Sequence, residues 1–176
     1  MRAGPRHVVP YEPVNPARPV PGAPYPDLMD ACAALADSID SLAGLGYPDG
    51  RFLKELGRVA GVRRGPFWVT DAATGGRNRI RGRGFRPEVD DDTAGQARHF
   101  AGTVAVAARV GGRITRWLTT NILRDPPESA DGRLSDEAIE FVRLVRSGDL
   151  AQADAADWIR ERLCHAPRRS AASDPA

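Results

Sequence analysis

The sequence predicts a mainly α protein, a single domain of about six packed helices with a small β-hairpin or loop excursion and disordered termini. Apolar residues recur at helical spacing through most of 27–165, glycines and prolines end each run, and both chain ends lack an apolar period. The 176 residues are enough to close one hydrophobic core. We therefore expect one helical domain over 27–165.

The two ends are expected to lie outside this domain. In residues 1–26 Pro recurs every few positions, which removes backbone donors and favours extended geometry, so this segment predicts a disordered Pro-rich arm. Residues 166–176 are small and polar and predict a disordered tail. Such an arm can bind an aromatic groove of a partner or serve only as a linker.

The first two helices are predicted by apolar stripes. In DLMDACAALADSIDSLAGLG, residues 27–46, apolar positions recur at intervals of four and three until Gly44 or Gly46 ends the run. After the turn YPDG, the stretch RFLKELGRVAG predicts a short second helix that closes at Gly61. The two stripes consist of Leu28, Cys32, Leu35, Ile39 and Leu42, and of Phe52, Leu56 and Val59.

Residues 62–89 interrupt the helical pattern. Phe67, Trp68 and Val69 are typical of a strand, and glycines then separate a series of arginines, which favours a hairpin or a flexible loop. We expect an Arg/Gly-rich loop at 71–89. Its arginines are Arg77, Arg79, Arg81, Arg83 and Arg86.

The third helix is predicted at 94–110 and is expected to be the most buried. The residues TAGQ at 93–96 have the form of a capping box, in which Thr93 accepts from the helix start and Gln96 reaches back. The helix is rich in Ala, Val and Gly, and Gly111 and Gly112 follow it. We expect this helix to lie at the centre of the bundle, where small residues let its neighbours pack closely.

Three further helices complete the prediction. Ile114, Trp117, Leu118 and Ile122 fit a fourth helix that ends before RDPPE. Leu134 before Ser135, with Ile139 in the following turn, predicts a fifth helix capped at Ser135 and ending at Gly148. Asp149 is expected to cap a sixth helix. Its buried stripe is Ala156, Ile159 and Leu163.

Charge and cysteine content exclude little. The net charge of +2 and the pI near 8.8 favour no particular class of partner.

Cys32 and Cys164 lie in the first and last predicted helices and could pair only if these helices touch, so without a CxxC spacing we expect buried free thiols. No signal-peptide or bilayer-spanning run is present. We expect a soluble cytoplasmic protein without a membrane partner, with signal-free export as the alternative.

The candidate polar site lies at the start of the third helix. The spacing of positions 92, 96, 99 and 103 predicts that Asp92, Gln96, His99 and Thr103 share one ridge. In this hypothesis His99 is a general base, with Gln96 and Arg98 beside it. Thr103 and Asn121, the latter from the next helix, would bind the ligand.

The alternative is that His99 is a core residue held by one hydrogen bond, and that Arg98 pairs with a nearby acid. A metal held by Asp92 and His99 together is not expected, since seven helical positions separate them by roughly 10 Å. We predict no metal and no cofactor. The acidic triplet at 90–92 is expected to diverge on a turn and to be neutralised by the arginine segment.

Alternating Arg and Gly residues also suggest RNA binding through Arg77, Arg79, Arg81 and Arg83, although no RNP, KH or zinc-finger pattern accompanies them. Our leading interpretation is a non-enzymatic helical interaction module that contacts a protein partner through the Pro-rich arm and the Arg-rich loop. The alternatives are a hydrolase or effector-type toxin with a site around His99, and an RNA-binding protein.

Overall fold

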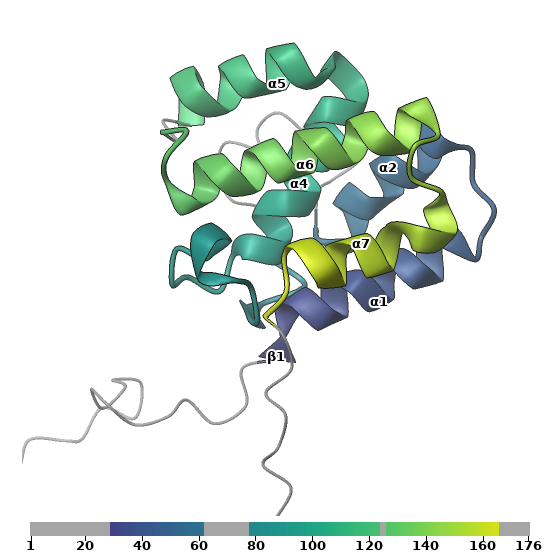
Figure 1. Cartoon of the computed structure of the whole chain (residues 1–176), viewed down its shortest axis with the longest axis horizontal. Coiled ribbons are helices and arrows are strands. Elements are labelled where there is room, and N and C mark those ends of the chain that lie inside the picture. The colour runs from purple at the N-terminus through teal and green to yellow at the C-terminus, as the bar shows by residue number, and fades with distance from the viewer. Residues whose placement is uncertain (1–28, 62–77, 124–125, 166–176) are drawn as a thin grey trace, which may run out of the picture.

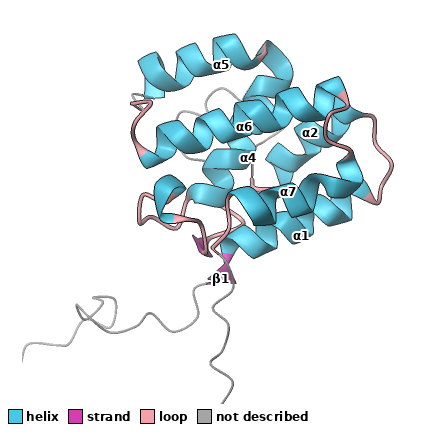
Figure 2. Ribbon diagram, in the orientation of Figure 1, coloured by secondary structure: helices cyan, strands magenta, loops and turns pink. Residues whose placement is uncertain are grey.

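A computed structural model describes residues 29–61, 78–123 and 126–165. The chain order is β1 (Met29–Asp30), α1 (Ala31–Ala43), α2 (Asp49–Val59), β2 (Gly82–Arg83), η1 (Pro87–Val89), α4 (Gln96–Val110), α5 (Gly112–Leu118), η2 (Thr119–Leu123), α6 (Ala130–Ser147), η3 (Gln152–Asp154) and α7 (Ala155–Arg162). Helices dominate this part of the chain, as Figure 2 shows, and the predicted mainly α single domain is confirmed. The predictions for the arm 1–26, for 62–77 and for the tail 166–176 lie outside the described residues.

Helix α4 lies at the centre of the bundle, as predicted. It packs against α6 on one side and α2 on the other (Figure 1). Phe100 of α4 meets Phe141 of α6 edge to face, with 5.7 Å between ring centroids, and Phe141 in turn lies 5.3 Å from the ring of Trp158 on α7. These rings join three helices in one continuous apolar core.

The small residues of α4 do allow a close approach. Gly57 of α2 faces Ala101 and Ala105, and a Cβ added at Gly57 would lie 2.4 Å from the Ala105 Cβ. Because non-bonded carbons cannot approach so closely, only glycine fits at position 57. The α2–α4 distance is therefore set by a pair of small side chains.

Helices α1 and α7 pack side by side and are joined covalently (Figure 1). Cys32 of α1 and Cys164, just after α7, form a disulfide with 5.5 Å between their Cα atoms. The expectation of buried free thiols is therefore wrong. The condition for pairing, contact between the first and last helices, is met because their stripes of apolar residues face each other across the core.

Three predicted helix starts are also wrong. Helix α4 begins at Gln96 with Gly95 as its N-cap, because the Thr93 hydroxyl bonds to Asp91 at 2.6 Å and Gln96 turns away. Helix α6 is capped by Ser129, whose oxygen accepts from Gly132 N at 3.0 Å, and so begins before Ser135. In each case several Ser, Thr and Asp residues compete for one helix end, and the cap is decided by the chain around them.

The start of α7 is displaced in the same way. Asp149 does not cap it, since its carboxylate accepts from Arg143 and from the Ser147 hydroxyl, and the short helix η3 intervenes. The stripe of Ala156, Ile159 and Leu163 is nevertheless buried as predicted. The C-terminal end of α6 at Gly148 is also confirmed, with a left-handed φ of 78° that favours glycine.

The described part of the β-like excursion forms a parallel pair, and the strand-like residues Phe67, Trp68 and Val69 lie outside the described residues. Strand β2 pairs with β1 in the register Met29 to Gly82 and Asp30 to Arg83. A Cβ at Gly82 would lie 1.9 Å from the Met29 carbonyl oxygen, and one at Gly84 2.1 Å from the Asp30 carboxylate. Asp30 also caps α1 by accepting from Ala33 N at 2.9 Å. These glycines therefore serve close packing against the start of α1.

The predicted fourth helix is present as α5 and η2, which end before Arg124. Its apolar stripe is largely exposed: Ile114 is 53% exposed, and Trp117 and Ile122 are each 58% exposed. The helix rests on α4 and α6 through Gly112, Thr115 and Thr119 instead. It lies along the outer edge of the bundle in Figure 1.

Candidate functional site

The candidate polar site is centred on a contact between α4 and α6. His99 Nε2 lies 2.8 Å from the Ser135 hydroxyl oxygen, and the two residues come from the first turns of α4 and the first half of α6. His99 is half-buried and Ser135 is only 1% exposed. A hydrogen bond of this length between imidazole and hydroxyl is the geometry of a base beside a nucleophile, and equally that of a core histidine satisfied by one partner.

Gln96 holds the entrance of this cluster together. Its buried side-chain amide donates to the Val89 carbonyl at 2.8 Å and to the Asp131 carboxylate at 3.1 Å. These bonds connect the start of α4 to η1 and to the first turn of α6. Both amide protons are thereby engaged within the protein, so Gln96 is a structural link between three segments.

The other predicted site residues are only partly brought together. Thr103 is buried on α4, one turn after His99. Arg98 is half-buried on α4 and is not an unpartnered cation. Asn121 lies exposed in η2, where its amide donates to the Trp117 carbonyl at 2.9 Å. The ligand contact expected from Asn121 stays a prediction.

Asp92 does not continue the ridge of α4. It lies before the helix with a φ of 64°, in a turn where Asp92 N donates to Asp90 and Thr93 N donates to Asp91. Burial is the largest influence on Asp90 and raises its pKa, against the opposing hydrogen bond from Asp92 N. The carboxylates of Asp90 and Asp91 therefore accept the hydrogen bonds that form this turn, as short acidic side chains commonly do.

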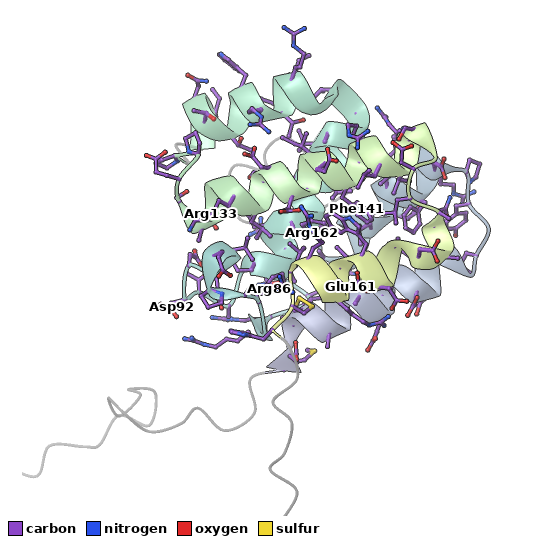
Figure 3. All side chains as sticks on the ribbon, viewed as in Figure 1. Arg86, Asp92, Arg133, Phe141, Glu161 and Arg162 are labelled. Carbon is purple, nitrogen blue, oxygen red and sulfur yellow. A yellow bond between two sulfur atoms is a disulfide. The ribbon has the colours of Figure 1, made fainter. Side chains whose placement is uncertain are left out.

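The arginines of the loop are divided between internal bonds and solvent. Arg83 pairs with Asp92 at 3.3 Å, which agrees with the predicted neutralisation of the acidic turn. Arg86 donates to the carbonyls of Cys164 and Glu161, and Figure 3 shows it beside Glu161 at the end of α7. Arg79 and Arg81 are exposed, and Arg77 lies outside the described residues.

This division weakens the geometric case for RNA binding. Gly82 and Gly84 pack against β1 and the α1 cap, so they do not leave the backbone open to approach by phosphates. Arg83 and Arg86 are committed to the protein. RNA binding through Arg77, Arg79, Arg81 and Arg83 stays a prediction, and among the described residues Arg79 and Arg81 are the exposed arginines that it would use beside Arg83.

Ser135 is the residue that sequence reasoning assigned to another role. Its position before an apolar run suggested a helix cap, whereas it faces α4 from inside α6. A helical face containing Leu134, Ser135, Ala138 and Val142 carries one hydroxyl among apolar residues, which was the available signal for an inward polar contact. In the described residues no cluster of three His, Cys, Asp or Glu side chains is placed to hold a metal ion.

The second candidate surface is the exposed face of α5 and η2, formed by Arg113, Ile114, Trp117 and Ile122, and called the α5 face below. Arg116 borders it and pairs with Asp136 of α6 at 2.7 Å. Several side chains of α5 stand away from the rest of the bundle in Figure 3. Exposed apolar side chains gathered on one helix indicate an interaction surface, whereas isolated ones are normal.

The fold and these two sites define a small helical domain with a buried polar contact and an exposed apolar helix. Comparisons with protein-family models, with curated proteins and with solved structures found no match to this chain. None of the helices in the described ranges has the length and hydrophobicity needed to cross a bilayer.

Proposed function

We propose that this chain is a non-catalytic helical interaction module. Its partner surface is the α5 face, and the Pro-rich arm 1–26 and the exposed Arg79 and Arg81 of the loop supply further contacts. The observation that carries the proposal is the exposure of Ile114, Trp117 and Ile122 on a single helix. Large apolar side chains held in water cost free energy, and a partner that covers them recovers it.

The packing of α5 supports a role outside the core. The helix contacts its neighbours with Gly112, Thr115 and Thr119, and its apolar residues contribute little to the described core. Polar residues in place of Ile114, Trp117 and Ile122 would leave these inward contacts unchanged. The choice of Ile and Trp there is therefore not required for folding, which favours a binding role.

A pull-down with quantified recovery tests the proposal. We expect Ile114→Ser combined with Trp117→Ser to lose most of the recovered partner, because the apolar contact is removed while the fold is kept. Leu45→Ser is the matched control, since Leu45 is 59% exposed but lies in the turn after α1. Deletion of 1–26 and neutralisation of Arg77, Arg79, Arg81 and Arg83 test the other two contacts. Recovery that no variant changes would contradict the proposal.

A second candidate, a hydrolase or effector-type toxin, is favoured by the His99–Ser135 contact alone. In such an enzyme His99 would accept the Ser135 proton as the hydroxyl attacks a carbonyl or phosphoryl centre. Against it stands the burial of Ser135, which is 1% exposed. His99→Gln and Ser135→Ala must both abolish a measured activity or toxicity at unchanged folded fraction for this candidate to hold.

The cytoplasmic location expected from the sequence stays a prediction, and the disulfide is a physical argument against it. Cytosolic thiols are kept reduced, and structural disulfides are typical of oxidising compartments. Alkylation of Cys32 and Cys164 in cells quenched and denatured with acid distinguishes the two locations, since unfolding exposes these buried residues and only reduced thiols react.

A further inference from the structure

The α5 face has an inverted amphipathic arrangement. Small and hydroxyl residues, Gly112, Thr115 and Thr119, face the bundle, while Ile114 and Trp117 face solvent. Thr115 and Thr119 return their hydroxyl protons to carbonyls of their own helix, at 2.8 Å to Gly111 and 3.0 Å to Arg116. The buried side of the helix can therefore consist of small residues whose hydroxyl groups all have hydrogen-bond partners, and the large apolar residues lie on the exposed side.

The end of the helix extends the same face. Residues Thr119–Leu123 form a π-helical turn, which holds more residues than an α turn. In an α-helix residues i and i+7 share a side, so with the wider turn Ile122, eight positions after Ile114, is brought to the side of Ile114 and Trp117. Ile122 is 58% exposed, in agreement with this placement. Single π turns of this kind are frequent at functional sites.

The α5 face carries cations but no acidic residue of its own. No Asp or Glu occurs in α5 or η2, whereas Arg113 and Arg116 do, and Asp136 of α6 lies beside Arg116. Arg113 is exposed and takes part in none of the ion pairs found among the described residues. Arg116 forms an ion pair with Asp136. The apolar residues are thus flanked by a cation whose charge the described protein does not neutralise.

We propose that the α5 face binds the surface of an anionic lipid bilayer. Ile114, Trp117 and Ile122 enter the boundary between head groups and acyl chains, and Arg113 contacts lipid phosphates. An amphipathic helix with Trp and Ile on one side and Arg beside them is the pattern of helices that lie in this boundary. The proposal rests on the interaction role of α5 proposed above and names its partner.

Shape and charge favour a lipid surface over other occupants. Helix α5 forms a ridge at the outer edge of the bundle (Figures 1 and 2), which suits a flat surface. A second copy of the chain would add another Arg113 to the interface and no carboxylate from α5 itself, so its α5 offers Arg113 no ion-pair partner. A head-group layer of phosphates is complementary in charge to Arg113. A helix that lies on a bilayer does not need the length of one that crosses it.

Co-sedimentation with lipid vesicles tests the proposal on the full chain. The probes are vesicles of equal parts phosphatidylglycerol and phosphatidylcholine, and vesicles of phosphatidylcholine alone. We expect binding to the anionic vesicles only, weakened by raising the salt concentration to about 0.5 M because the Arg contacts are screened. Ile114→Ser with Trp117→Ser should lower the partition coefficient about tenfold or more, and Arg113→Glu at least about fivefold.

Two matched controls address non-specific effects. Leu45→Ser removes an exposed apolar side chain away from the face, and Lys54→Glu reverses an exposed cation on α2. Both should bind like the wild type, and circular dichroism should show the same helix content for every variant. Loss of binding in the controls as well would overturn the proposal, because vesicle binding would then depend on the total charge or hydrophobicity of the protein and not on the α5 face.

The remaining outcomes separate this inference from the proposed function. Absent or equal binding to both kinds of vesicle overturns the lipid proposal. If the α5 variants still lose a protein captured in the pull-down, the interaction role stands with a protein as partner. If sedimentation shows a dimer that Trp117→Ser dissociates, the occupant is a second copy. If neither vesicles nor any partner depends on the α5 face, both proposals fail.

Discussion

Cys32 at the start of α1 and Cys164 after α7 are joined across a sequence separation of 132 residues, so that one covalent bond closes almost the whole described chain into a loop. Arg86 and Phe85 lie against the same end: the Arg86 side chain donates to the Cys164 carbonyl at 3.2 Å, and Phe85 pairs with Cys164 in an isolated bridge. The disulfide thereby fixes the loop before α4 as well as the two helices that carry it.

Reduction of this disulfide is expected to destabilise the protein strongly. Closing so long a loop lowers the entropy of the unfolded chain, which corresponds to about 3 to 5 kcal/mol in the free energy of unfolding. Urea titration with and without reductant, and of Cys32→Ala with Cys164→Ala, measures this difference. Titration of the unfolded, unreduced protein with a thiol reagent should find no reactive thiol. Reaction of both cysteines would show that they are free thiols and would contradict the disulfide.

Gly57→Ala is expected to destabilise the α2–α4 contact by about 1 to 3 kcal/mol, because its Cβ would overlap the Ala105 side chain. The Ala101 carbonyl oxygen, 3.3 Å from the added Cβ, limits relaxation in the other direction. Ala105→Gly in the same chain should recover part of the loss by removing the overlapping methyl group. Thermal unfolding of the two single variants and the double variant checks this; a harmless Gly57→Ala would mean that the helices lie further apart.

Gln96→Leu should cost about 1 to 3 kcal/mol despite its apolar side chain. The Val89 carbonyl and the Asp131 carboxylate would each lose a donor, and a buried polar group without a partner carries most of its desolvation cost. Gln96→Glu is the matched comparison, since it keeps the shape and places a carboxylate against Asp131. We expect Gln96→Glu to recover stability as the pH falls and this pair becomes protonated, and a pH-independent loss would argue against the Asp131 contact.

The His99–Ser135 contact makes a separate prediction by double-mutant cycle. His99→Phe and Ser135→Ala should each destabilise the protein, with a coupling energy of about 1 kcal/mol between them. Additive losses would show that the two side chains do not bond. The cycle is independent of any activity, so it measures the structural role that both candidate functions share.

Asp90 carries a pH prediction. Burial raises its pKa, so ionisation of this carboxyl opposes folding, and the penalty is complete at pH values above the raised pKa. As the pH falls through that pKa toward the ordinary Asp value, the penalty disappears. Asp90→Asn should therefore stabilise the protein at pH 7, by less than about 1 kcal/mol after solvent screening, and should have no advantage at pH 3. Equal effects at both pH values would contradict this origin.

The packing of a helix was predictable where its apolar residues lie along one side, because that side is buried in the core. The stripes of Leu35, Ile39 and Phe52, and the central position of α4, follow from period and composition, and they are buried as expected. Helix starts were not predictable, because Thr93, Ser129 and Ser135 offer similar hydroxyls and tertiary contacts select among them. Pairing of Cys32 with Cys164 depends on contacts between distant helices, which local patterns do not contain.

Helix α5 shows the main limit of pattern reading. Period detects that Ile114 and Trp117 share a side, but it does not say which side meets the core. Here Gly112 accommodates the Ile139 side chain of α6, and a Cβ at Gly112 would lie 2.6 Å from it, so the small side had to turn inward. For the polar site, His99 was predictable as an anchored residue, while Ser135 as its partner needed the α4–α6 packing.

The accessibility of Trp117 tests the central claim most directly. In a chain with Trp68→Phe and Trp158→Phe, Trp117 is the sole indole, and acrylamide quenching of its fluorescence reports its contact with water. We predict efficient quenching in the free monomer and protection after addition of anionic vesicles, with no protection by neutral ones. A Trp117 that is already shielded in the free monomer would contradict the outward placement of the α5 face, and with it the docking role assigned to this helix.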